Sequence, residues 1–68
     1  MQATHDRTET LQLRDAVIEA RNDYYSGRGT EAAMNEATDA YIAAIKRFYA
    51  SKGLRKSPPS RAYLLRAL

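Results

Sequence analysis

The fold is decided by residues 30–53, whose sequence is TEAAMNEATDAYIAAIKRFYASKG. Thr30 is a typical helix N-cap, and the negative charge of Glu31 suits the positive end of a helix. Gly53 is typical of the left-handed residue that follows a helix, and the basic residues before it suit the negative end. These start and stop signals predict one helix over about residues 31–52.

Apolar residues inside this stretch recur every three or four positions, which places them on one face of a helix. We expect this stripe to form the core, and its members are Met34, Ala37, Tyr41, Ile45 and Phe48. Ile42 and Tyr49 lie on one side of the stripe, and small alanines lie on the other. An apolar surface this broad predicts a helix that is contacted on two sides.

A preceding helix is predicted over about residues 7–26, because neither Gly nor Pro interrupts them and Asp6 or Thr8 can cap the start. This helix carries two apolar stripes about a third of a turn apart. The first stripe contains Leu13, Val17, Ala20 and Tyr24, and the second contains Leu11, Ile18 and Tyr25. One stripe suffices to pack against the second helix. The other predicts a further partner, either the C-terminal segment or another chain.

The connections between the helices differ in kind. Residues 26–29 are Ser-Gly-Arg-Gly, a short glycine-rich link that favours two antiparallel neighbouring helices. The linker at residues 57–60 contains two prolines and is expected to be extended, with Ser60 capping a short helix over about residues 61–67. A helix this short is not stable alone, so it lies either on the long helices or on a partner.

The predicted fold class is therefore all-α, an antiparallel helical hairpin plus a short C-terminal helix in one domain of 68 residues. A chain of this size buries a small core, and small scaffolds usually gain stability from disulfides, metals or oligomerisation. Cysteine is absent, and one histidine cannot build a metal site. We therefore expect a homodimeric helical bundle.

Charge is distributed unevenly along the chain. Residues 1–39 hold all eight acidic residues and four of the eleven basic ones, a net charge of −4, whereas residues 40–68 hold seven basic residues and no acid. This pattern indicates one of two things: the basic half binds an acidic protein or a nucleic acid, or the two halves of the chain attract each other. The candidate basic patch consists of Lys46, Arg47, Lys52, Arg55, Lys56 and Arg61.

Two rows of charge lie on the first helix. The arginines recur every seven residues, at Arg7, Arg14, Arg21 and Arg28. We interpret them as side chains whose aliphatic stems cover apolar surface, with a row that grips a partner's anions as the alternative. The acids Asp15, Glu19 and Asp23 recur every four residues. We interpret them as a solvated face, with a docking strip for a basic partner as the alternative.

Tyrosine is the favoured aromatic residue, with five tyrosines against one phenylalanine and no tryptophan. Tyrosine tolerates half-wet positions and recurs in interface hot spots. The candidate residues of a partner or dimer interface are Leu11, Ile18, Tyr25, Ile42, Tyr49 and Tyr63. No catalytic residue, metal ligand or cofactor is predicted, since the chain lacks a cysteine, a glycine-rich phosphate loop and a second histidine to support His5.

No apolar run approaches the ~20 residues that span a bilayer, and the N-terminus lacks the apolar core of a signal peptide. A cytoplasmic protein is therefore expected.

The helical patterns of Leu11–Tyr25 and Met34–Phe48 and the basic segment Lys52–Arg61 resemble those of small phage-encoded helical regulators, anti-activators and anti-CRISPRs among them. The resemblance implies a non-enzymatic protein that binds and inhibits another protein in the host cytoplasm, such as a transcription regulator or a nucleic-acid-binding protein. Two alternatives stay open: direct binding of DNA or RNA by the basic patch, and a structural subunit of a larger assembly.

Overall fold

The computed structural model describes residues 7–68, and within this range the secondary structure is entirely helical. Its elements are α1 (Arg7–Tyr25), α2 (Glu31–Ser51) and α3 (Arg61–Ala67), without a strand in the described range. The all-α prediction is confirmed. Because α1 begins at Arg7, Thr8 lies inside the helix and is not its cap. The other predicted cap, Asp6, lies outside the described residues, as does His5.

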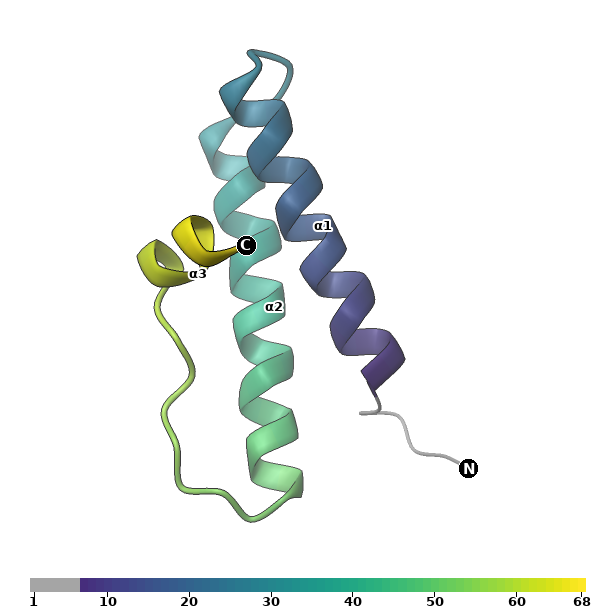
Figure 1. Cartoon of the computed structure of the whole chain (residues 1–68), viewed down its shortest axis with the longest axis vertical. Helices are drawn as coiled ribbons and strands as arrows, with labels where there is room; N and C mark the ends of the chain where they lie inside the picture. The colour runs from purple at the N-terminus through teal and green to yellow at the C-terminus, as the bar shows by residue number, and fades with distance from the viewer. Residues whose placement is uncertain (1–6) are drawn as a thin grey trace.

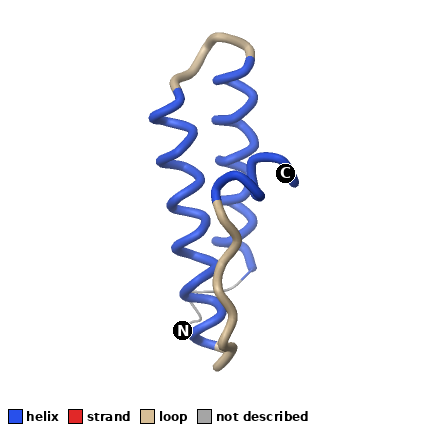
Figure 2. Tube along the Cα trace, turned by 90° about the vertical axis from the view of Figure 1, so that its left-hand side faces the viewer, coloured by secondary structure: helices blue, strands red, loops and turns tan. Residues whose placement is uncertain are grey.

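The two long helices lie side by side and run in opposite directions (Figure 1). From the far end of α2 the chain returns along that helix as an extended segment and ends in α3. Viewed from the side, α3 crosses in front of the long helices near their mid-height (Figure 2). The molecule measures 39 × 25 × 17 Å along its principal axes. The C-terminal helix thus covers one flank of the α1–α2 pair.

The turn between α1 and α2 depends on two glycines. Gly27 has a φ of +84° and donates from its N–H to the Tyr24 carbonyl, at 3.2 Å. The Arg28 N–H reaches the Asp23 carbonyl at 2.8 Å, which completes the Schellman pattern of a helix end. At Gly29, an added Cβ would lie 3.0 Å from the Cβ of Asp23 and 3.2 Å from the backbone nitrogen of Tyr24, so a side chain there would require the end of α1 to shift by a few tenths of an ångström. The glycine-rich link therefore turns the chain within a few residues.

The predicted caps of α2 are confirmed. The Thr30 side chain accepts a hydrogen bond from the Ala33 N–H at 3.1 Å. At the other end Gly53 has a φ of +70°, and the Leu54 N–H donates to the Tyr49 carbonyl at 2.9 Å. This is a second Schellman ending, and it directs the chain back along α2.

The core differs from the predicted stripe. The described residues that are buried are Val17, Met34, Thr38, Ala44 and Leu64. Of the five stripe residues only Met34 is buried, and the other four are half-buried. The reason is that α3 as well as α1 packs on α2, so the most enclosed part of α2 extends toward α3 rather than following a single stripe.

Thr38 is the buried polar residue that the apolar pattern did not predict. Its side chain is fully buried, and its hydroxyl donates to the Met34 carbonyl one turn earlier, at 2.7 Å. Because this bond satisfies the hydroxyl within its own helix, the methyl group of threonine can pack like that of valine. A threonine can therefore occupy a core position here.

Candidate interaction surfaces

The α1 outer stripe, defined as Leu11, Ile18 and Tyr25, lies only partly covered. The exposed fraction is 39% for Leu11 and 69% for Tyr25, while Ile18 is half-buried. The Tyr25 ring lies 5.5 Å from the Tyr24 ring, tilted by 46°. The second stripe of the first helix is thus left with apolar side chains in contact with solvent at both of its ends.

On the side of α2 that carries Ile42 and Tyr49, the chain's own C-terminal segment, residues 52–68, contacts Tyr49. The Lys56 ammonium lies 5.2 Å from the centre of the Tyr49 ring, and α3 packs on α2 further up. Both Ile42 and Tyr49 are half-buried. Tyr63, on α3, is 57% exposed. The six candidate interface residues therefore lie on three helices, and the C-terminal segment contacts Tyr49 among them.

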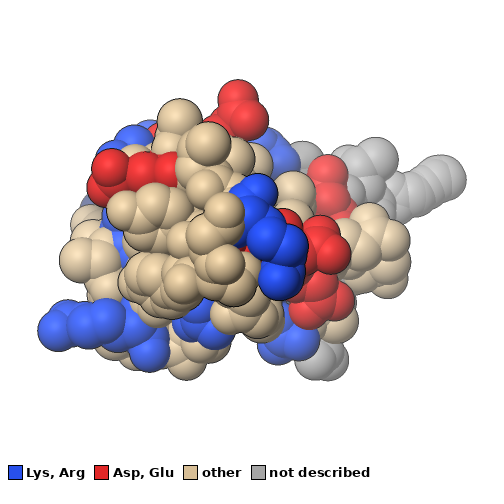
Figure 3. Space-filling model, turned by 90° about the horizontal axis from the view of Figure 1, so that it is seen from above, with Lys and Arg blue, Asp and Glu red and all other residues tan. Residues whose placement is uncertain are grey.

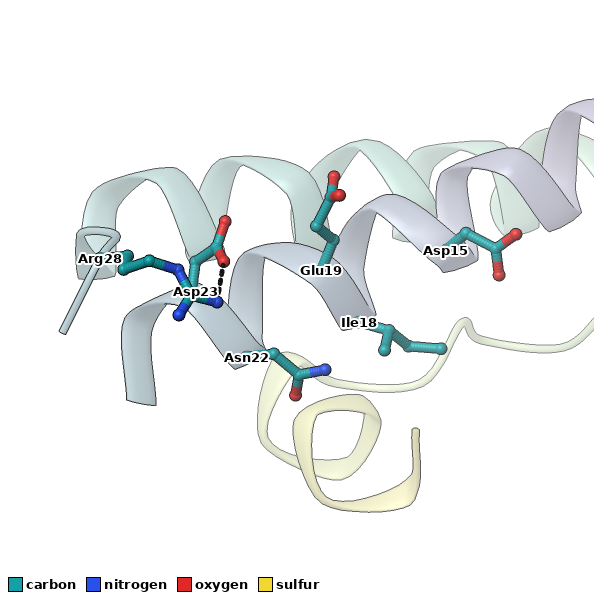
Figure 4. Close-up of a pocket in the computed structure, with 6 residues that line it drawn as sticks. All are labelled: Asp15, Ile18, Glu19, Asn22, Asp23 and Arg28. Atoms are coloured by element: carbon teal, nitrogen blue, oxygen red, sulfur yellow. Dashed lines mark hydrogen bonds and ion pairs between the residues drawn. The ribbon is translucent and has the colours of Figure 1, made fainter. Parts of the chain in front are cut away.

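Beside the α1 outer stripe lies a shallow hollow of about 430 Å³ (Figure 4). We call it the acidic hollow, and its lining residues are Asp15, Ile18, Glu19, Asn22, Asp23 and Arg28. The Arg28 guanidinium pairs with the Asp23 carboxylate at 3.1 Å, which neutralises one end. Glu19 and Asp15 are exposed along the rest. The hollow combines carboxylates with an apolar residue, a surface suited to a basic ligand with an apolar group.

All six residues of the basic patch are exposed, but they do not form one continuous unit. Arg61 binds Asp39 with two hydrogen bonds, from Nε to Oδ1 at 2.8 Å and from Nη2 to Oδ2 at 2.7 Å. These hydrogen bonds lower the pKa of Asp39 and raise the pKa of Arg61, with the direct charge attraction acting in the same direction. Arg47 reaches Glu9 at 3.9 Å. Arg61 thus serves to hold α3 on α2.

Two of the remaining basic residues, Lys52 and Lys56, lie over aromatic rings near the end of α2. The Lys52 ammonium lies 5.7 Å from the centre of the Phe48 ring, and the Lys56 ammonium lies 5.2 Å from that of Tyr49. The two rings are themselves 6.3 Å apart. Cations over aromatic faces are held in preferred positions while staying open to solvent. The C-terminal end of α2 therefore presents a cationic surface that lies on aromatic rings.

Arg21 has a role that the sequence did not reveal. Its guanidinium donates to the carbonyls of Leu65, at 3.2 Å, and of Leu68, at the end of α3. The last carbonyls of a helix lack partners within it and carry partial negative charge, so a guanidinium there both satisfies and stabilises them. The seven-residue spacing of the arginines marked Arg21 as unusual, but only the position of α3 identifies its acceptor.

The other arginines of the row also bind within the chain. Arg28 pairs with Asp23, and the Arg14 guanidinium lies 3.6 Å from the Asp15 carboxylate while its Nε is buried. The side chain of Arg7 lies outside the described part. For the three described arginines, the interpretation as structural side chains fits better than a row directed at a partner.

Viewed from the end that carries the α1–α2 turn, acidic and basic side chains surround an uncharged centre (Figure 3). Within residues 7–68 no group of three or more His, Cys, Asp or Glu side chains is arranged to hold a metal ion. In the same range no helix is both long and apolar enough to cross a membrane.

No protein-family model, curated protein or solved structure matches the chain.

Proposed function

We propose that this chain is a small non-catalytic interaction module that binds another protein and inhibits it. The observation that carries the proposal is the α1 outer stripe, where Tyr25 is 69% and Leu11 is 39% exposed. Large aromatic side chains surrounded by charged groups are typical centres of protein interfaces.

The chemistry of the partner follows from what borders the stripe. Ile18 belongs both to the stripe and to the acidic hollow, where Asp15 and Glu19 are exposed. Complementary charge steers association and selects between partners. A basic surface, such as that of a transcription regulator or another nucleic-acid-binding protein, fits best. Binding there would block the contacts that such a protein makes with nucleic acid.

The test is affinity purification from the native host with tagged wild-type protein, a Leu11→Ala/Tyr25→Ala variant and a Leu54→Ala variant. Leu54 is a matched control, because it is 44% exposed but lies beyond the end of α2. We expect wild type and Leu54→Ala to retain one protein in stoichiometric amount and to inhibit its activity. The Leu11→Ala/Tyr25→Ala variant should do neither. Equal retention by all three would contradict the proposed surface.

Direct binding of DNA or RNA is the second candidate, favoured by the cationic, aromatic end of α2. Lys46, Lys52, Arg55 and Lys56 would contact phosphates, and affinity would fall steeply with salt. A salt titration against duplex DNA tests this, with Arg55→Ala/Lys56→Ala and, as a charge-matched control, Arg28→Ala/Arg66→Ala. Loss of binding in the first variant alone would favour nucleic acid. Absence of binding by the wild type at low salt would eliminate it.

We also propose that the protein self-associates as a homodimeric helical bundle. The described buried core is small, and the wide apolar surfaces of α1 and α2 exceed what one seam needs. Sedimentation at micromolar concentration tests this proposal. A monomer at every concentration would contradict it.

A further inference from the structure

The chain reverses direction just after α2, at one end of the long axis of the molecule (Figure 1). We call residues 52–56, which begin this reversal, the α2 tip, and all of them are exposed. In a Schellman ending, the apolar residue after the glycine often packs back on the helix. Leu54 follows Gly53 in this way, yet its exposed fraction is 44%. The α2 tip therefore presents an apolar side chain to solvent.

The charge around Leu54 is entirely positive. Lys52, Arg55 and Lys56 are exposed, and none of them pairs with a carboxylate in the described part of the chain. From residue 40 onward the sequence contains no acidic residue that could neutralise them nearby. An apolar side chain among uncompensated cations is the combination that attaches proteins to anionic lipid surfaces.

The aromatic rings at the α2 tip favour lipid over nucleic acid. Phe48 and Tyr49 are half-buried, and the ammonium groups of Lys52 and Lys56 lie over them at 5.7 and 5.2 Å from the ring centres. Proteins that bind single strands stack bases on open aromatic faces. The phosphates of a duplex would contact the lysines but would leave Leu54 unused. A lipid surface engages both, because its headgroups attract cations and its acyl chains accept an apolar side chain.

We propose that the α2 tip binds the surface of an anionic lipid bilayer, with Lys52, Arg55 and Lys56 against the headgroups and Leu54 between the acyl chains. Each basic side chain near such a surface strengthens binding about fivefold, so three of them give a reversible attachment. The α1 outer stripe lies on the other long helix. The lipid contact is therefore independent of the protein partner proposed above.

Sedimentation with lipid vesicles tests this proposal. The full chain is mixed with vesicles of phosphatidylcholine, either pure or with about a third of phosphatidylserine. We expect binding to the anionic vesicles alone, weakened about 25-fold in Arg55→Ala/Lys56→Ala and about fivefold in Leu54→Ala. The charge-matched control Arg28→Ala/Arg66→Ala should change the affinity by about twofold or less, because these arginines lie away from the tip and salt screens distant charges. All five side chains are exposed, so each variant should keep its fold.

Tryptophan fluorescence shows whether residue 54 enters the bilayer. The chain contains no tryptophan, so Leu54→Trp carries a single reporter. Its emission should shift to shorter wavelength on anionic vesicles. Tyr25→Trp is the control, because Tyr25 is 69% exposed where α1 meets the turn, at the opposite end of the hairpin (Figure 1). Its emission should not change.

Three results would overturn the lipid contact. The first is absence of binding to anionic vesicles at low salt, and the second is equal loss in the charge-matched control. The third is wild-type vesicle binding by Leu54→Ala with no fluorescence shift at residue 54. If duplex DNA then binds more tightly than the vesicles and Arg55→Ala/Lys56→Ala abolishes this binding, the surface belongs to nucleic acid. None of these results bears on the protein partner, which is tested through Leu11 and Tyr25.

Discussion

The contact between α1 and α2 and the contact between α3 and that pair are built in different ways. The long helices are joined by a short turn in which Gly27 and its neighbours satisfy the end of α1 through local hydrogen bonds. The short helix is joined by an extended segment and held by one buried leucine and two arginines. Local chemistry thus sets the first contact, and a few distant side chains set the second. The second contact should therefore be the first to open.

The largest effect is expected from Val17→Asp, which should unfold the chain and thereby open both contacts. Val17 is fully buried, so a carboxylate there would lose its hydration without gaining a partner. A loss of about 4 kcal/mol or more exceeds what a domain this small can spare. Circular dichroism should show an unfolded chain. Gln12→Asp, which adds the same charge at an exposed position of α1, should change stability by less than about 0.5 kcal/mol.

The next largest effect separates the two contacts. Leu64→Ala removes the buried side chain of α3 and should weaken that contact by about 3 kcal/mol. Amide hydrogen exchange should then show faster exchange in α3, with α1 and α2 still protected. Tyr63→Ala, at an exposed position of the same helix, should cost less than about 1 kcal/mol. Equal loss of protection in all three helices would show that the contacts are not independent.

Substitution of the two glycines with positive φ tests how the backbone conformation at the ends of α1 and α2 contributes to each contact. Gly27→Ala and Gly53→Ala each force alanine to a positive φ, at about 1–2 kcal/mol, and neither added Cβ meets an atom within 4 Å. Gly27→Ala should lower the free energy of unfolding measured in urea. Gly53→Ala should chiefly loosen α3, because it redirects the chain that leads there. Similar hydrogen-exchange patterns for both variants would argue against this division.

The smallest effect on stability is expected from lowering the pH. Hydrogen bonding to Arg61 lowers the pKa of Asp39 below its ordinary value of 3.8. Stability from this pair is therefore complete above about pH 4–5 and is lost as the pH falls through the lowered pKa. NMR should show α3 amides losing protection in that window before those of α1 and α2. In Asp39→Asn this pH step should be absent, and an unchanged step would assign it to another carboxylate.

The features that could be predicted are those whose causes are local. Thr30, Gly53 and Ser60 each act within one helical turn, and the structure confirms their roles. The buried residues of α2 were harder to predict, because periodicity finds an apolar stripe but cannot show where a third helix will pack on it. Tyr41 therefore lies at the centre of the predicted stripe yet is only half-buried, while Thr38 is fully buried.

The candidate surfaces could likewise be predicted only where their causes are local. The α1 outer stripe was visible as apolar residues in excess of one seam, and Leu11 and Tyr25 are indeed exposed. That the C-terminal segment contacts the Tyr49 side of α2 could not be predicted, because the sequence indicated a helix contacted on two sides without identifying the second contact. The same holds for Arg61, whose charge marked it as part of a patch while its geometry ties it to Asp39.

By itself, the sequence determined the helices, their caps, the glycine turn and the uneven charge, because capping, φ preference and periodicity act over a few neighbouring residues. Only the tertiary structure decided where α3 lies, that Arg21 and Asp39 hold it, and which apolar residues stay in water. Those outcomes depend on contacts between residues more than 20 positions apart, such as Asp39 with Arg61 and Arg21 with Leu65. No local pattern encodes a contact of that range.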